Sequence, residues 1–184
     1  MRFNESFQEF PMMETERLVL RELQPDDAED YYTYFSDQEV TRFWGYDCPK
    51  DIKTVASTFV RFRNAFKRKE MIVWGIAFKE TNQICGTCIL GSFVRGSMAN
   101  VSYNLSAEQW NKGIMIEALG AILPFGFHQL GLHRIQAMAM PENKASIRLL
   151  EKLDFKKEGL LRAYAFGSLF TDTLIYALLA EECN

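Results

Sequence analysis

Residues 110–118 carry the most specific chemical signal in the chain. A hydrophobic strand at 101–105 runs into a short polar loop, and a helix is predicted to begin at Gly113. Such a turn aims several unpaired backbone N–H groups and the positive end of a helix at one point, where they can bind a phosphate, and Lys112 adds a side-chain charge there. The loop lacks both the G-x-G-x-x-G of a dinucleotide site and the second glycine of a P-loop. It therefore indicates a different phosphate-bearing cofactor.

The elements that would position this loop follow from the hydrophobic spacing. Strands are predicted over 16–23, 71–78, 84–90, 100–105, 134–140, 156–167 and 169–179, and helices over 28–35, 51–69, 113–130 and 143–153. Pro124 cannot donate a hydrogen bond to Gly120, so we expect a kink or a tightened turn there, and Gly96 is expected to turn the chain into the fourth strand. Strands followed by a β-α-β unit predict an α/β fold of the α+β type, with a mixed sheet and helices on both faces.

Composition fits a soluble enzyme domain of the cytoplasm. The 184 residues, 48% of them hydrophobic, predict a single domain over 1–184, with 1–13 as an N-terminal extension. The net charge of −3 and the pI near 5.5 give no reason to expect nucleic acid or anionic lipid as a partner. No apolar run approaches the roughly 20 residues of a membrane span, and residues 1–13 lack the apolar block of a signal peptide.

Cys85 and Cys88 form a C-x-x-C, which can be half of a zinc site or a redox pair. A zinc site needs a second half, and Cys48 and Cys183 are isolated in the sequence. A redox pair is expected where a loop meets a helix N-terminus, whereas this pair lies in a predicted strand, where residues three apart point to opposite faces. We favour ordinary buried, reduced thiols and predict no metal.

Three stretches resemble the GNAT superfamily of N-acetyltransferases, in particular the branch of ribosomal-protein N-terminal (alanine/serine) acetyltransferases. They are residues 14–28, 109–118 and 141–159, and with 172–179 they follow the order of the family along nearly the whole chain past residue 13. The resemblance implies a seven-stranded, mostly antiparallel sheet with a central splayed parallel strand pair. It also implies acetyl transfer from acetyl-CoA to a primary amine by direct attack in a ternary complex, and leaves a homodimer open.

The resemblance assigns contacts with the cofactor as well. The pantetheine arm would lie between strands 100–105 and 134–140, and the pyrophosphate on the N–H groups of 111–115. The cofactor-binding residues predicted in this way are Asn104, Leu105, Trp110, Asn111, Lys112, Gly113, Ile114, Met115, Asn143 and Ser146. Met115 is bulkier than the glycine or alanine that the family pattern carries. Asn143 and Ser146 can equally form an ordinary helix N-cap, and the two roles can coexist.

The residues that would transfer protons differ from the pattern of the family. The three positions at which relatives carry a glutamate or a tyrosine hold Asn100, Leu150 and Ala163. The catalytic candidates that remain are Tyr103, Ser146 and Tyr164. A tyrosine can relay a proton or bind the thiolate, although tyrosines in strands are more often part of the core. Asp172 matches an acid that is common in the branch. Alternatively, it has a structural role in a turn or at the edge of a strand.

The missing base bears on the choice of acceptor. An α-amino group has a pKa of about 7.7–8.0 and lysine one near 10.4, so at neutral pH roughly a tenth of an N-terminus is neutral, against less than about a thousandth of lysine. General base catalysis typically adds about 10²–10⁴-fold. A protein N-terminal α-amine or a small amine is therefore the expected acceptor. Phe43 and Trp44 either line the entrance for this acceptor or only pack in the wall beside it. The alternative is a catalytically weak acetyl-CoA-binding module that regulates or binds a partner.

Overall fold

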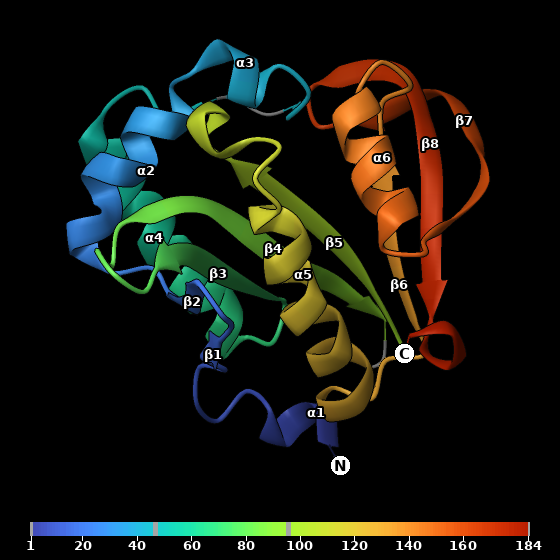
Figure 1. Cartoon of the computed structure of the whole chain (residues 1–184), viewed down its shortest axis with the longest axis horizontal. Helices are drawn as coiled ribbons and strands as arrows, with labels where there is room; N and C mark the ends of the chain where they lie inside the picture. The colour runs from blue at the N-terminus through green and yellow to red at the C-terminus, as the bar shows by residue number, and fades with distance from the viewer. Residues whose placement is uncertain (1, 46–47, 95–96, 184) are drawn as a thin grey trace.

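The computed structural model describes residues 2–45, 48–94 and 97–183, so the turn expected at Gly96 lies outside the described residues. Eight strands form one sheet in the order β1-β2-β3-β4-β5-β6-β8-β7 (Figure 1). They are β1 (Met13–Glu14), β2 (Leu18–Glu22), β3 (Met71–Phe78), β4 (Ile84–Val94), β5 (Met98–Leu105), β6 (Arg134–Ala139), β7 (Lys156–Phe166) and β8 (Leu169–Leu179). The seven predicted strands are all present. The expected strand count was one short, because the two-residue β1 is too short to show alternation in the sequence.

Every neighbouring pair of strands is antiparallel except β5 and β6, which lie parallel in the middle of the sheet. The predicted mixed sheet with a central parallel pair is therefore confirmed. The β-α-β connection between these two strands places one helix and its N-terminal loop directly beside the point where they meet.

The helices are α1 (Arg2–Glu5), α2 (Ala28–Phe35), α3 (Gln38–Thr41), α4 (Ile52–Lys67), α5 (Ile114–Pro124) and α6 (Lys144–Lys152), with single turns η1 (Pro25–Asp27), η2 (Ala107–Gln109), η3 (Phe125–Gln129) and η4 (Ala180–Glu182). Asp51 caps α4 by accepting a hydrogen bond of 2.7 Å from the backbone N–H of Thr54. The irregularity expected at Pro124 is present, but the turn is wider rather than tighter. After the proline, Leu130 N–H donates to the carbonyl of Phe125, five residues back, at 3.1 Å.

Helices cover both faces of the sheet, as predicted (Figure 1). α2 and α4 pack on β4 and β3, whereas α5 and α6 cover the other face. The side chains of β3 point alternately to the two faces of the sheet, and both faces are covered, which explains why the sequence of this strand is apolar throughout. Val73 belongs to the buried cluster under α2 and α4, and its neighbour Trp74 belongs to the larger cluster under α5. Both faces of this strand are therefore core.

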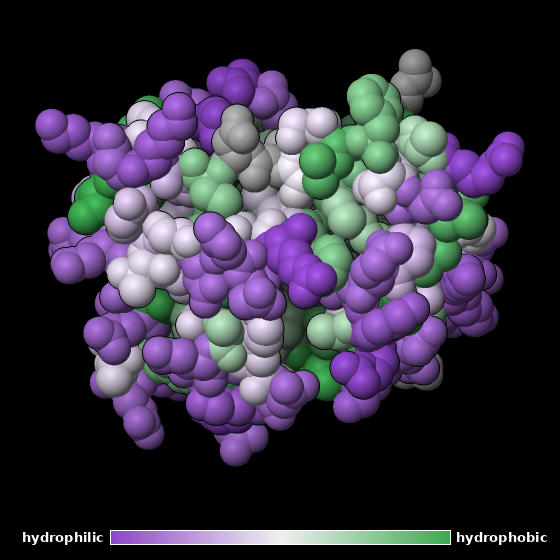
Figure 2. Space-filling view, turned by 90° about the horizontal axis from the view of Figure 1, so that it is seen from above, coloured by the Kyte–Doolittle hydropathy of each residue, from purple (hydrophilic) through white to green (hydrophobic). Residues whose placement is uncertain are grey.

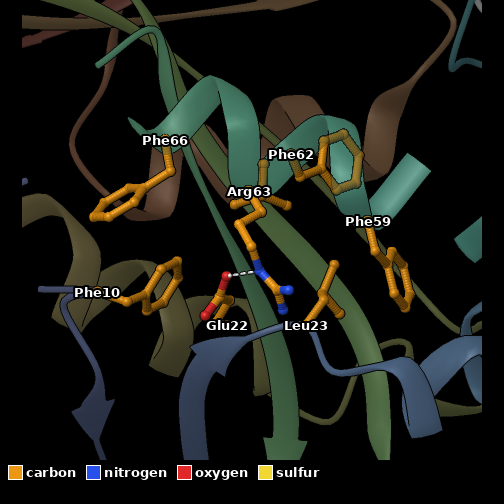
Figure 3. Close-up of a pocket in the computed structure, with 8 residues that line it drawn as sticks. Phe10, Glu22, Leu23, Phe59, Phe62, Arg63 and Phe66 are labelled. Carbon is orange, nitrogen blue, oxygen red and sulfur yellow. Dashed lines mark hydrogen bonds and ion pairs between the residues drawn. The ribbon is translucent and has the colours of Figure 1, made fainter. Parts of the chain in front are cut away.

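The N-terminal segment packs against one end of the sheet through aromatic rings. The ring of Phe7 lies 5.3 Å from that of Phe66 in α4, and Trp74 Nε1 donates to the carbonyl of Pro11 at 2.7 Å. Figure 3 shows the small hollow beside Phe10, where rings of α4 surround an ion pair of Arg63 with Glu22. This hollow is filled by its own side chains and lies apart from the central parallel pair of strands.

Cys85 and Cys88 are buried and free, as expected, but they do not point to opposite faces. A β-bulge in the pairing of β3 with β4 shifts the register at Ile76, and both thiols join the same core cluster. Burial raises the pKa of Cys85 to about 12 and that of Cys88 well above its usual value. The described residues contain no group of three or more His, Cys, Asp or Glu side chains placed to hold a metal ion. In the same part of the chain, no helix has the length and apolar character needed to cross a membrane.

Candidate active site

The parallel strands β5 and β6 pair over only three positions and then separate. Met98, Ala99 and Asn100 pair with Arg134, Ile135 and Gln136, and no later pair between the two strands occurs among the described residues. Beyond this point β5 continues against β4 alone and β6 against β8 alone. The sheet therefore contains a V-shaped opening, called the splay from here on, which α5 and α6 flank (Figure 1).

The exposure of β5 shows that the splay is open to solvent. Ser102 lies in the middle of an interior strand, yet its side chain is exposed. Asn100, at the last paired position, has a buried Oδ1 with no hydrogen-bond partner among the described residues. Seen from above, the molecule shows a narrow hollow near its middle, with both hydrophilic and hydrophobic side chains at the rim (Figure 2).

The loop between β5 and α5 has the conformation that a phosphate site needs. Asn111 and Gly113 have positive φ angles of 61° and 78°, and Gly113 is the N-cap of α5. Because glycine has no side chain that could cap the helix, the first N–H groups of α5 are left for another acceptor. Trp110 anchors the other end of the loop by donating its Nε1–H to the carbonyl of Leu105 at 2.8 Å.

The side chains after the glycine do not crowd this loop. Ile114 and Met115 are both buried in the core, with the sulfur of Met115 4.0 Å from that of Cys88. Only the backbone of these two residues faces the loop, so the bulk of Met115 leaves it free. Lys112 is exposed, and its Nζ donates to the side chain of Gln109 at 3.3 Å.

A hydrogen bond crosses the splay between two of the predicted catalytic residues. The hydroxyl of Tyr103 on β5 lies 2.8 Å from Oγ of Ser146 in the first turn of α6. Burial raises the pKa of Tyr103 above its ordinary value, and the contact with Ser146 opposes that shift only in part. Asn143 forms the N-cap, because its Oδ1 accepts the backbone N–H of Ser146 at 3.1 Å. The N-cap prediction is confirmed, and it leaves the hydroxyl of Ser146 free to reach Tyr103.

On the α2 side of β5, a buried polar cluster remains incompletely bonded. Thr87 donates its hydroxyl to Oδ1 of Asn104 at 3.1 Å and also interacts with the hydroxyl of Tyr34, but Nδ2 of Asn104 has no hydrogen-bond partner in the described residues. Thr87, Asn104 and Tyr34 are 1%, 7% and 5% exposed. A buried polar atom without a partner is costly and is therefore uncommon away from functional sites. The sequence predicted Asn104 as a cofactor contact, but not the unpartnered Nδ2 of its side chain.

Tyr164 is not brought into contact with the pair of Tyr103 and Ser146. It is 37% exposed on the outer strand β7, where it pairs with Thr171. Asp172 accepts the backbone N–H of Ala163 at 2.9 Å, which is the strand-edge role foreseen as one reading. Ala163 has a φ of 48° at a bulge in β7. Leu150 is fully buried in the core.

A backbone bridge joins the loop after α3 to the turn between β7 and β8. The carbonyl of Gly45 accepts the N–H of Ser168 at 2.7 Å and its hydroxyl at 3.1 Å. Next to this contact, Trp44 packs edge-on against Phe35 of α2, with ring centroids 5.4 Å apart. The wall-packing alternative for Trp44 is therefore present. The guanidinium carbon of Arg42 lies over the ring of Phe43, 5.2 Å from the ring centroid.

Sequence reasoning missed one charged contact at the phosphate-type loop. Arg17 precedes β2, and its guanidinium reaches the carbonyl of Lys112 at 3.1 Å and a carboxylate oxygen of Glu117 at 2.7 Å. Both residues lie inside stretches already noted for their resemblance to relatives. Their separation of about 100 residues hid the contact, because nothing in a single sequence pairs them.

The splayed sheet and the loop at the N-terminus of α5 are the features expected of an enzyme that transfers an acyl group from a phosphate-bearing donor. Comparison makes the assignment specific. The Acetyltransferase (GNAT) domain matches residues 17–156, and the chain belongs to this family. It is an acetyl-CoA-dependent N-acetyltransferase, which confirms acetyl transfer as its reaction and acetyl-CoA as its donor.

Three known proteins show the range of the similarity. The chain is 35% identical over 173 residues to Uncharacterized N-acetyltransferase YoaA of Bacillus subtilis (strain 168), covering 92% of this chain and 97% of that protein. It is 30% identical over 159 residues to the ribosomal protein uS5-alanine N-acetyltransferase of Escherichia coli (strain K12), covering 82% and 80%. The solved structure of Mycobacterium smegmatis RimJ in complex with CoA-disulfide has the same fold, with a TM-score of 0.83, 24% identity, and 93% and 88% of the two chains covered.

Proposed function

We propose that this enzyme acetylates an α-amine, either a protein N-terminus or a small amine of similar pKa. The observation that carries the proposal is the pair of hydroxyls across the splay. Tyr103 has a raised pKa, so it is protonated at neutral pH and can give a proton but not take one. The positions at which relatives carry a base hold Asn100 and Ala163. An acceptor that is already partly neutral suits such a site best.

We propose the loop from Trp110 to Met115 as the binding site for the phosphates of the donor. Support comes from the uncapped N-terminus of α5, the positive φ of Gly113 and the exposed Lys112. The unpaired edges of β5 and β6 suit the amides of a pantetheine arm, and Nδ2 of Asn104 is a buried donor that needs an acceptor. The described residues thus fit acetyl-CoA.

In the proposed reaction, acetyl-CoA supplies a thioester carbonyl to the attacking amine. The residues of the splay hold the two reactants in a ternary complex. Tyr103 donates its proton to the leaving thiolate, while Ser146 donates to the phenol oxygen and stabilises it as the proton moves. The proton of the amine leaves to solvent along the exposed face that Ser102 marks, and the phenolate of Tyr103 takes a proton back from solvent before the next turnover.

The identity of one relative favours a peptide acceptor. The Escherichia coli protein that shares 30% identity is named as an alanine N-acetyltransferase of ribosomal protein uS5. Acetylation of an N-terminal alanine is chemistry at an α-amine. We take this as support for a small N-terminal residue as the acceptor, and propose the cytoplasm as its compartment, since all four cysteines are free.

Matched peptides test the proposal. One peptide carries a free N-terminal alanine and no lysine, and its partner has a blocked N-terminus and one lysine. Mass shift and thiol release are measured for both, at pH 7 and pH 9. We expect at least about a hundredfold preference for the α-amine at pH 7, from the difference in neutral fraction. A preference for the ε-amine at pH 7 would refute the proposed acceptor.

A second function is favoured by Leu150 and Ala163 standing where relatives carry proton-transfer residues. In that case the chain binds acetyl-CoA and acts as a regulatory or partner-binding module with little turnover. Calorimetric binding of acetyl-CoA, without thiol release over a broad amine panel, would support it. Thiol release with any amine of the panel above the rate of hydrolysis excludes it.

A further inference from the structure

We infer that Arg17 is a positioning residue that holds the loop at Lys112–Gly113 in its phosphate-binding shape through Glu117. This inference rests on the proposed phosphate site. It concerns a residue outside the loop and outside the splay, from the segment just before β2.

Glu117 accepts three hydrogen bonds from the segment before β2. Its Oε1 accepts the hydroxyl of Thr15 at 2.6 Å and the backbone N–H of Arg17 at 2.8 Å, and its Oε2 accepts Nε of Arg17 at 2.7 Å. The Glu117 side chain is only 16% exposed. Burial opposes its charged form, but the hydrogen bonds from Thr15 and Arg17 together outweigh burial and lower its pKa. Glu117 is therefore a fixed carboxylate at neutral pH.

The same guanidinium fixes the peptide that precedes Gly113. Nη1 of Arg17 donates to the carbonyl of Lys112 at 3.1 Å. In a trans peptide the carbonyl and the N–H point in opposite directions, so holding this carbonyl toward Arg17 aims the N–H of Gly113 away from it. A Cβ on Gly113 would lie 3.6 Å from Nη2 of Arg17, so the guanidinium lies directly beside the loop.

The pair also removes an electrostatic conflict. Glu117 lies in the first turn of α5, where a carboxylate favours the helix but repels a phosphate at the same end. Arg17 neutralises that charge while leaving the backbone N–H groups of the loop unblocked. The arrangement keeps the N-terminus of α5 available for an anion.

A second ion pair of the same kind provides a matched control. Arg63 in α4 bonds to Glu22 of β2 at 2.9 Å, and its side chain is 43% exposed, against 45% for Arg17. This pair links β2 to a helix without touching the loop (Figure 3). Any effect of losing a surface ion pair alone should appear equally in both.

The test uses R17Q, E117Q and R63Q in the full chain, with the affinity for unacetylated CoA measured by calorimetry. We expect R17Q to weaken CoA binding by about tenfold to 100-fold and R63Q to leave it unchanged. E117Q decides between positioning and direct charge. If Arg17 simply attracted phosphate, E117Q would make the site more positive and tighten binding. If Arg17 positions the loop through Glu117, E117Q weakens binding, which is the result expected.

Hydrogen exchange of the protein without ligand gives a second readout that does not depend on the proposed function. R17Q and E117Q should speed amide exchange across 111–117, while exchange in β3 stays at the wild-type rate. Loss of protection in β3 as well would mark a general folding defect and overturn the inference, as would an unchanged or tighter CoA affinity in E117Q. Failure of the wild-type chain to bind CoA would refute the proposed phosphate site. The exchange result would then decide alone whether Arg17 and Glu117 hold the loop in shape.

Discussion

Replacing Tyr103 by phenylalanine removes one hydroxyl from the splay and leaves the ring in place. The lost contact is the hydrogen bond of 2.8 Å to Ser146. A single neutral hydrogen bond of this kind contributes about 1 kcal/mol to stability, which for a chain of this length lowers Tm by about 2–4 °C. Loss of a general acid costs about 10²–10⁴ in kcat. The expected effect on catalysis is thus much larger than the effect on folding.

The assay compares Y103F, S146A and wild type by steady-state thiol release, with the melting temperature measured in parallel. Y103F should lower kcat at least about a hundredfold with little change in the KM for acetyl-CoA. S146A should lower kcat less, because Tyr103 keeps its proton and the backbone N–H of Ser146 still donates to Asn143. S146A therefore removes the hydroxyl pair while it leaves the helix cap at Asn143 intact.

The pH profile of the same enzymes adds a signed expectation. Because burial raises the pKa of Tyr103, wild-type kcat should rise with the deprotonation of the acceptor and show no falling limb up to about pH 10, the ordinary tyrosine pKa. Removing the Ser146 hydroxyl takes away the contact that lowers this pKa, so S146A should not gain a falling limb either. A kcat of Y103F within about fivefold of wild type would refute the assignment of Tyr103 as the proton donor.

Three further outcomes follow from the packing. Gly167 has a φ of 61°, and a Cβ there would clash with the carbonyl oxygen of Gly45, so G167A should lower Tm by several degrees. G159A should not, because no atom lies within 4 Å of the new methyl group. The ion pair of Asp27 with Arg21 is largely buried and closes at 2.7 Å. D27N removes the carboxylate that neutralises this guanidinium and should cost about 3 kcal/mol in urea unfolding. Burial raises the pKa of Cys88 above its ordinary value, so iodoacetamide at pH 8 should leave Cys88 unmodified in the native protein and label it after unfolding, as read by peptide mass; labelling at equal rates in both states would contradict the burial.

The sequence was most informative where a signal is local. Periodicity and an N-terminal Pro-Asp-Asp predicted α2 to within its observed bounds of Ala28–Phe35, and the polar turn at 81–83 placed the β3–β4 hairpin. The Gly113 loop was predicted from residue types alone, because a positive φ and a helix start leave a clear pattern in one short stretch.

The parts that could not be predicted depend on register and long-range geometry. A single-residue bulge turned Cys85 onto the face of Cys88, and strand alternation alone gave the opposite answer. The contact of Arg17 with Glu117 joins residues 100 positions apart. The unpartnered Nδ2 of Asn104 likewise depends on which groups face it across the sheet, and no property of residues 100–105 alone fixes that.

The splay gives the sheet an unusual mechanical property. Among the described residues, strand pairing between its two halves, β1 to β5 and β6 to β7, comprises three residue pairs at one end of β5 and β6. A molecule that bonds to both inner edges takes the place of the hydrogen bonds that the two strands do not make to each other. Its binding free energy then adds to the cohesion of the fold, by about 2.7 kcal/mol at a hundred times its Kd. If acetyl-CoA binds between these strands as proposed, the resistance of this protein to unfolding is coupled to the concentration of its own donor.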